Sequence, residues 1–119
     1  MRIEDMDNPF ANDMFAMVYQ AFRNLYNEKD KNLIIYWSVE PMKDDDGNEA
    51  FGSTTFTDTY VYIEVSSDLK VSDSVEILAH ELAHVAVGSN EEHGEEWEKA
   101  FDAIFTEYNR IGDKMFGIQ

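Results

Sequence analysis

All three histidines of the chain fall within one short segment, together with a glutamate that could act beside them. His80 and His84 belong to the string His-Glu-Leu-Ala-His, and His93 opens the string His-Gly-Glu-Glu-Trp. Residues four apart lie on the same face of an α-helix, so the imidazoles of His80 and His84 can bind a single ion. A third imidazole would complete the three-ligand set of a catalytic zinc site, whose fourth position stays open for water. The spacing therefore predicts a zinc site formed by His80, His84 and His93.

Glu81 follows His80 directly and would lie about 100° further round the same helix. From that position its carboxylate could reach a water molecule on the ion without being a ligand itself. It could take a proton from this water and pass it to the leaving amine of a cleaved amide. An aspartate would be one methylene too short, and we therefore predict Glu81 as the general base.

The surroundings of the motif argue against two surface histidines with an unrelated acid nearby. Residues 75–79 and 82–87 are apolar nearly all the way round a helix, which is typical of a buried helix. Imidazoles and a carboxylate on a buried helix need polar partners, and a metal ion supplies one.

The identity of the third ligand distinguishes the classes of zinc peptidase from one another. Metzincins require glycine and histidine where Val87 and Asn90 stand. A glutamate from a later helix, as in thermolysin-like enzymes, stays open as an alternative, and Glu98 or Glu107 could supply it. We favour His93, because the glycine that follows it permits a tight bend and Trp97 can anchor the next helix.

Three predicted helices and three predicted strands would position these residues. Asn8 and Pro9 are typical of a helix start, and apolar residues at helical spacing continue that helix to about residue 27. We expect strands at 33–39, 51–56 and 60–65, and residues 57–59 would join the last two as a hairpin. Residues 43–49 are expected to form a solvated turn rather than a calcium loop. We expect the histidine-bearing helix to be capped by Ser72 or by Asp73, which could form a capping box with Glu76. We expect this helix to end at Gly88. A last helix is expected to run from 95 to 110.

Composition places the chain among soluble globular proteins. With 119 residues, 44% hydrophobic residues and no cysteine, we expect a single domain over 1–119 with neither disulfides nor a cysteine zinc ribbon. No apolar run is long enough to cross a membrane and the first residues lack the apolar segment of a signal peptide, so we expect a cytoplasmic protein without membrane contact.

The formal net charge of −16 bears on partners, because nucleic-acid binding depends on lysine and arginine at the phosphates. The nearest approach to a basic cluster, Lys29 and Lys31, is interrupted by Asp30. We expect no direct binding of nucleic acid.

The string from His80 to His84, a short spacer, and His93-Gly94 followed by Trp97 resembles the SprT-like zinc metalloprotease domain, and it is similar to the related WLM proteases. The resemblance is specific over residues 76–101. It implies a minimal zincin-like α+β fold with an N-terminal helix, a small three-stranded mixed sheet, the active-site helix and a C-terminal helix. It also implies that His93 is the third zinc ligand and that Trp97 packs in the helix after it.

We therefore expect a zinc-dependent metallopeptidase that hydrolyses peptide bonds of a protein or peptide substrate, with zinc-activated water and Glu81 as general base. Two alternatives stay open: a non-catalytic zinc-binding or structural module, and a zinc hydrolase acting on a non-peptide amide. A purely structural site would not need a carboxylate at position 81. Tyr60, Tyr62 or Tyr108 could donate a phenol to the oxyanion, and their spacing does not choose among them.

Overall fold

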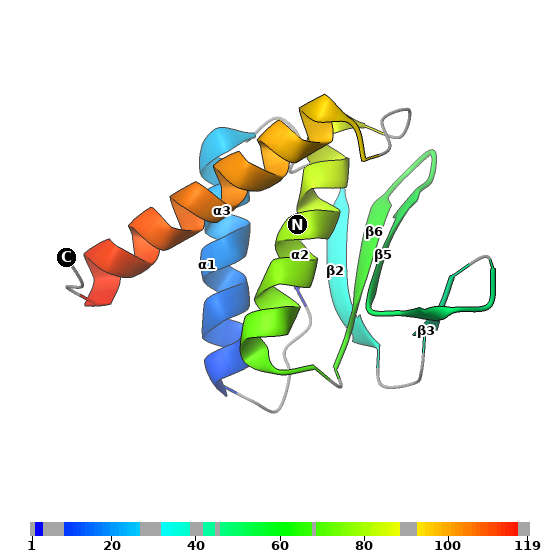
Figure 1. Ribbon diagram of the computed structural model, residues 1–119, viewed down its shortest axis with the longest axis horizontal. Coiled ribbons are helices and arrows are strands. Elements are labelled where there is room, and N and C mark those ends of the chain that lie inside the picture. Colours follow the sequence, from blue (N-terminus) through cyan, green and yellow to red (C-terminus); the bar gives the residue numbers. More distant parts are fainter. Residues whose placement is uncertain are drawn as a thin grey trace.

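The helices of the chain pack together on one face of a small mixed sheet (Figure 1). The computed structural model describes residues 2–3, 9–26, 32–38, 42–44, 46–67, 69–88 and 93–116. Its elements, in chain order, are β1 (Arg2–Ile3), α1 (Pro9–Leu25), β2 (Leu33–Ser38), β3 (Met42–Lys43), β4 (Glu49–Ala50), β5 (Gly52–Phe56), β6 (Val61–Ser66), α2 (Val71–Val87) and α3 (Glu95–Phe116). The α+β class is confirmed.

The main sheet has the strand order β1-β2-β6-β5. The strands β1, β2 and β6 are parallel, and β5 pairs with β6 antiparallel. The three expected strands are thus present, and the two-residue β1 extends the sheet beyond β2. The hairpin between β5 and β6 closes at Thr57, whose hydroxyl donates to the carbonyl of Tyr60 at 2.6 Å.

Alternation along the strands separates a buried face from a wetter one. On β6, Ile63 and Val65 are fully buried against the helices, as expected from their spacing. They share the core with Leu33 and Ile35 of β2. The helices contribute large buried side chains to the same core, among them Phe15, Phe22, Leu78, Leu82 and Ile104.

The helix α2 is buried on most of its circumference, which confirms the reading of its apolar sequence. Its start differs from the expectation, because the helix begins at Val71 and Lys70 occupies the N-cap position without a side-chain cap. The first helical hydrogen bond runs from the amide of Ser74 to the carbonyl of Lys70, at 2.9 Å. The predicted caps are therefore wrong: Ser72 and Asp73 lie inside the first turn, where the Asp73 carboxylate still favours the helix dipole.

The end of α2 follows the prediction. Gly88 adopts φ +93°, a region that favours glycine, and its amide donates to the carbonyl of His84 at 2.9 Å. The helix α3 is longer than expected and continues past Arg110 to Phe116, while α1 ends at Leu25. The predicted cap Asn8 lies outside the described residues.

The predicted turn at 43–49 connects β3 and β4, a short antiparallel hairpin that the sequence did not suggest. The carboxylate Oδ1 of Asp44 accepts hydrogen bonds from the backbone amides of Asp46 and Asn48, each at 2.9 Å. Gly47 supplies the positive φ of +82° that the turn needs. The Asp44 carboxylate therefore organises the turn itself.

No helix in the described ranges is long and apolar enough to span a membrane.

Candidate metal centre

The structure brings the three histidines to one point. The helix α2 carries His80 and His84, and His93 lies just before α3. The Nε2 atom of His93 is 3.0 Å from Nε2 of His84 and 3.0 Å from Nε2 of His80. The candidate ligand atoms of all three lie within 4.8 Å of one another. Two residues four apart on a helix and one from the following connection thus present their ring nitrogens to a common centre.

A cation fits this arrangement better than hydrogen bonds among the rings do. A neutral imidazole has one N–H donor and one acceptor nitrogen, so three facing Nε2 atoms cannot all be satisfied by each other. A tetrahedral ion with bonds of about 2.0–2.1 Å would accept all three lone pairs and leave one position open. Within the described ranges, these histidines form the one set of His, Asp and Glu side chains close enough to hold a metal.

The environment of His80 favours the neutral ring that metal binding requires. Burial lowers the pKa of His80 to about 4, and the neighbouring His84 and His93 contribute in the same direction. At neutral pH the ring of His80 is therefore neutral and can offer a nitrogen lone pair to an ion. The resistance to protonation comes chiefly from burial and then from placing three basic rings together.

Trp97 forms one wall of the centre. Its ring centroid lies 4.7 Å from that of His80 and 4.7 Å from that of His93. Its indole N–H donates to the carbonyl of His80 at 3.2 Å. Trp97 therefore joins the first turn of α3 to α2 beside the histidines, as the sequence suggested for an anchoring residue.

Glu81 is almost fully buried at 6% exposure and lies at the edge of the histidine cluster. Its Oε2 is 3.9 Å from Nε2 of His80. Burial raises the pKa of Glu81 to about 7, and a hydrogen bond from Thr54 opposes that rise. The hydroxyl of Thr54 donates to Oε1 at 2.8 Å. One carboxylate oxygen is thus held by the sheet while the other faces the histidines.

Gly52 lets β5 approach α2 closely at this carboxylate. A Cβ atom at position 52 would lie 2.5 Å from Cγ2 of Ile77 and 3.0 Å from Oε2 of Glu81. Both distances are shorter than ordinary van der Waals contact, so a side chain there would displace the edge strand or the carboxylate. The approach also brings Thr54 within hydrogen-bonding distance of Glu81.

The sequence reading did not identify Thr54 as part of the site. A signal was present, because alternation places Thr54 on the same face of the strand as Gly52, towards the helices. A hydroxyl on the core-facing row of a strand needs a polar partner. Only the packing of β5 against α2 identifies that partner as Glu81.

The alternative glutamate ligands do not join the cluster. Glu107 accepts hydrogen bonds from Arg110 and, at 2.8 Å, from the amide of Asn24 on α1. Glu98 is an exposed residue of α3 and is not part of the set that gathers at the histidines.

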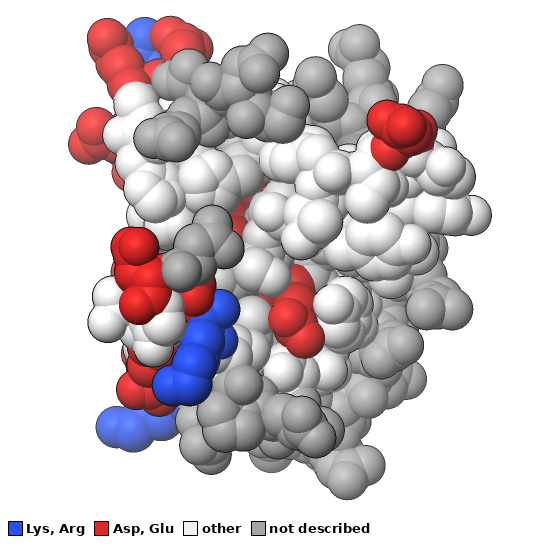
Figure 2. Space-filling view, turned by 90° about the vertical axis from the view of Figure 1, so that its right-hand side faces the viewer, with Lys and Arg blue, Asp and Glu red and all other residues white. Residues whose placement is uncertain are grey.

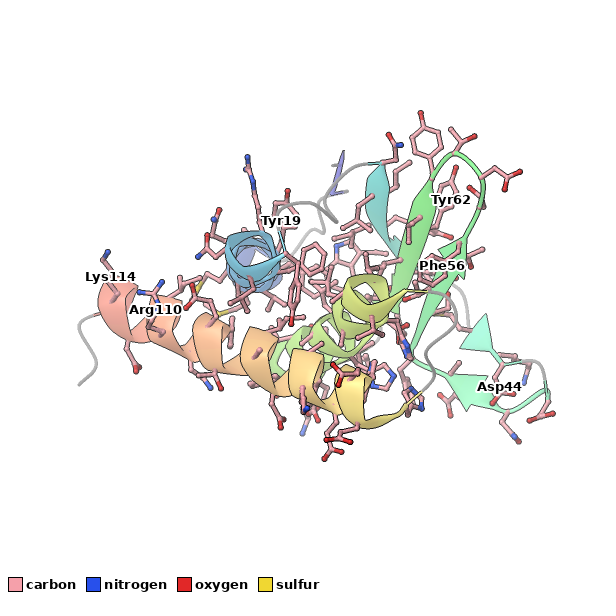
Figure 3. All side chains as sticks on the ribbon, turned by 90° about the horizontal axis from the view of Figure 1, so that it is seen from above. Tyr19, Asp44, Phe56, Tyr62, Arg110 and Lys114 are labelled. Carbon is pink, nitrogen blue, oxygen red and sulfur yellow. The ribbon has the colours of Figure 1, made fainter. Side chains whose placement is uncertain are left out.

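The three tyrosines considered for the oxyanion lie elsewhere. The hydroxyl of Tyr108 contacts Sδ of Met14 at 3.4 Å, between α3 and α1. Tyr60 and Tyr62 contact each other, with ring centroids 6.0 Å apart, and Tyr62 lies on the hairpin of β5 and β6 (Figure 3). Alternation along β6 places Tyr62 on the sheet face opposite to the buried Ile63.

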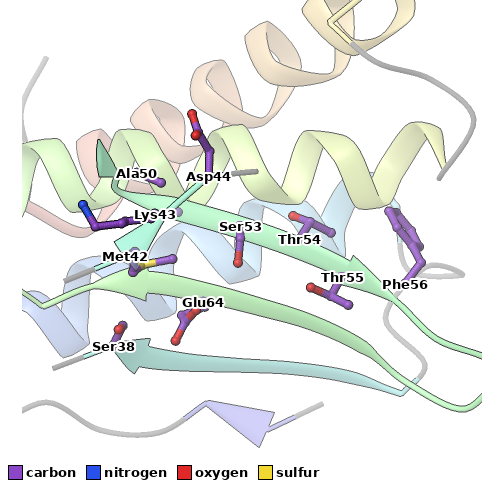
Figure 4. Close-up of a pocket in the computed structure, with 11 residues that line it drawn as sticks. Ser38, Met42, Lys43, Asp44, Ala50, Ser53, Thr54, Thr55, Phe56 and Glu64 are labelled. Carbon is purple, nitrogen blue, oxygen red and sulfur yellow. The ribbon is translucent and has the colours of Figure 1, made fainter. Parts of the chain in front are cut away.

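A separate hollow of about 790 Å³ lies where the β3–β4 hairpin meets β5 and β6 (Figure 4). Its lining includes hydroxyl side chains of β2 and β5, Glu64 of β6, and Lys43 and Asp44 of the β3–β4 hairpin. None of the three histidines lines it, so this hollow is not part of the candidate metal centre.

The fold and the site together define a small α+β protein with a three-histidine centre and an adjacent buried carboxylate on one helix. The chain belongs to the SprT-like family, whose family model matches residues 11–115. No curated protein and no solved structure gives a significant match. The resemblance seen in the motif residues is thereby confirmed over most of the chain.

Proposed function

We propose that this protein is a zinc-dependent metallopeptidase. The observation that carries the proposal is the placement of Glu81, whose buried carboxylate lies beside three converging imidazoles in a SprT-like chain. A site kept only for structural stability would have no use for a buried carboxylate that is not a ligand. Burial of such a group costs free energy, and a catalytic role accounts for keeping it.

His80, His84 and His93 would hold the ion. Zinc held by these histidines would supply a water of lowered pKa and would polarise the carbonyl of the substrate. Glu81 would accept the proton of the attacking water and deliver it to the leaving amine. Thr54 would keep the carboxylate oriented during both transfers by its bond to Oε1.

The neighbouring sheet supports a polypeptide substrate over a small amide. The strand β5 lies at the end of the order β1-β2-β6-β5, and no strand of the described residues pairs with its outer side. An extended chain can add to such an edge by main-chain hydrogen bonds. Because Thr54 of this strand contacts Glu81, a peptide bound along β5 would pass close to the proposed base.

The test combines metal analysis with peptide hydrolysis. We expect about one zinc per purified chain, and His80→Ala, His84→Ala and His93→Ala should each lose most of it. Glu81→Gln should keep the zinc but lose at least about a hundredfold of its activity on a casein-type substrate, because the amide cannot accept the water proton. Glu98→Gln is the matched control and should retain both zinc and activity.

Two outcomes would replace the proposal with its alternatives. If the zinc-loaded wild type cleaves no protein or peptide, and small amides are cleaved instead, the protein is a non-peptide amide hydrolase. If it cleaves neither, it is a zinc-binding structural module. Zinc retained by His93→Ala and lost by Glu98→Gln would reject the ligand set.

A further inference from the structure

The helix α3 crosses α2 (Figure 1). A groove of about 580 Å³ lies on the surface between these two helices. Aromatic side chains and carboxylates form it together. Its lining consists of Glu76 from α2 and of Phe101, Asp102, Phe105, Thr106 and Asn109 from α3.

A row of contacting aromatic rings connects the lining of the groove to the histidine cluster. Trp97, which contacts His80, stacks on Phe101 with centroids 5.4 Å apart and planes 4° from parallel. Phe101 lies 5.6 Å from Phe105, the next ring of the groove. The ring of Phe101 is itself only 6.4 Å from the ring of His80. A polypeptide cleaved at the histidines could therefore place a side chain in the groove from within two or three residues of the cleaved bond.

The charges of the groove favour a cation. Glu76 and Asp102 are both exposed carboxylates, and neither forms an ion pair with a side chain in the described part of the chain. No lysine or arginine is among the lining residues. Glu76 precedes His80 by one helical turn, which puts this charge on the side of α2 that faces the centre. Two unpaired carboxylates flanking two phenyl rings match a flexible apolar stem that ends in a positive charge.

We propose that this groove binds a lysine or arginine side chain of the polypeptide substrate, next to the bond that is cleaved. The inference rests on the proposed peptidase function and specifies its substrate class. The methylene stem of the basic residue packs against Phe101 and Phe105, and its charged end reaches Glu76 and Asp102. An acidic side chain is disfavoured at the same position because it would meet two like charges.

The preference should be moderate, because the groove is open to solvent. Exposed ion pairs and cation–π contacts each contribute little, and together they correspond to about tenfold in binding or in kcat/KM for lysine over glutamine. High salt should reduce the ionic part of the preference and leave the contact with the rings.

The test uses matched peptides that differ only in having lysine, glutamine or glutamate at one position. Each position flanking the cleaved bond is varied in turn. One position should favour lysine over glutamine by about tenfold, and Glu76→Gln/Asp102→Asn should reduce this ratio to about twofold. Glu76→Lys/Asp102→Lys should reverse the order and favour glutamate. The control Glu49→Gln/Asp113→Asn removes the same charge from exposed positions outside the groove and should leave the ratio unchanged.

Peptide binding can be measured without cleavage, and this measurement distinguishes the groove proposal from the proposed peptidase function. The Glu81→Gln protein is titrated with the same peptides carrying a fluorescent label, so that affinity is read without cleavage. A lysine preference in binding that depends on Glu76 and Asp102 supports the groove even if the wild type hydrolyses nothing. The inference is overturned if no position prefers lysine in binding or in cleavage, or if the preference persists at full size in Glu76→Gln/Asp102→Asn.

Discussion

The orientation of Glu81 depends on one hydroxyl from a strand far away in the sequence. Thr54 donates to Oε1 of Glu81 at 2.8 Å, while Oε2 is directed towards His80 at 3.9 Å. Small displacements of a general base are costly, because proton transfer requires the carboxylate to lie within hydrogen-bonding distance of the water. Thr54 is therefore a positioning residue of the proposed site, because it would act through Glu81.

Thr54→Val should lower kcat by about tenfold while KM and zinc content stay nearly unchanged. Valine keeps the branched shape and removes the donor, so the carboxylate loses its orientation but the packing remains. Thr54→Ser should restore most of the activity. Thr55→Val is the matched control, because alternation places Thr55 on the opposite face of β5. A Thr54→Val protein with unaltered kcat would show that the bond has no part in positioning Glu81.

The geometry of the candidate metal centre depends on two junctions between elements. At one end, Gly52 lets β5 approach α2 so that Glu81 is covered and held. At the other end, Trp97 fastens the start of α3 to α2 and so fixes the direction from which the third histidine enters. Neither junction is a ligand contact, yet each determines where a functional group lies.

A polar cluster further along α3 connects this helix to α1. The carboxylate of Glu107 accepts from Arg110, at 2.9 Å for Nη2, and from Asn24 of α1 at 2.8 Å. These hydrogen bonds lower the pKa of Glu107 from an ordinary value of 4.5 to about 2. The bonds from Arg110 contribute most to this shift, and the bond from Asn24 comes next. A group with a lowered pKa in the folded state stabilises the fold above its unfolded pKa, and this stabilisation is lost as the pH falls towards the folded value.

Glu107→Gln should therefore reduce the free energy of unfolding at pH 7 by about 0.5–1 kcal/mol, a small value because the cluster is close to solvent. The difference from the wild type should shrink progressively as the pH falls from about 4.5 to about 2. Urea denaturation at a series of pH values measures it, with Asp113→Asn, an exposed carboxylate on the same helix, as the control. A difference that grows towards acidic pH would contradict the role assigned to this carboxylate.

For the whole molecule, binding of the ion and folding should be coupled, because the ligands come from α2 and from the connection to α3. Three imidazoles can bind together only when these segments are docked, so zinc should stabilise the folded state over the unfolded one. Removing zinc with a chelator should lower the Tm by about 10 °C or more when zinc had been in large excess over its Kd. Calorimetry or circular dichroism measures this. The His93→Ala protein should show little further change with chelator, and an equal Tm with and without zinc in the wild type would contradict the coupling.

The high negative charge of the molecule leads to a prediction about nucleic-acid binding. At −16 the long-range field repels phosphate, and on the face shown in Figure 2 the described lysine and arginine side chains lie beside acidic ones. Lys29 and Lys31 are outside the described residues. We expect no binding to single- or double-stranded DNA at about 10 µM protein and physiological salt, measured by gel shift or anisotropy. Binding that weakens steeply as salt increases would reveal a basic surface formed only in three dimensions.

Much of the candidate site could be predicted from the sequence because the relevant geometry is local. The four-residue spacing of His80 and His84 places both on one helical face wherever that helix lies. The apolar circumference of 75–87 indicated its burial, and glycine at position 88 indicated its end, and both are observed. The family follows from the same strings, since the motif residues are themselves the shared feature.

Contacts between distant segments were decided by the tertiary structure alone. The sequence predicted His93 as a ligand, but its position beside the helix histidines depends on how α3 docks through Trp97. The bond from Thr54 to Glu81 depends on the close approach of β5 at Gly52. The groove beside the histidines likewise exists only because α3 crosses α2. No periodicity along the chain encodes these relations, because a repeat reports which face a residue occupies and not which element packs against that face. The position of the Glu81 carboxylate, and the substrate side chain that the proposed groove would accept, are therefore properties of the packed molecule.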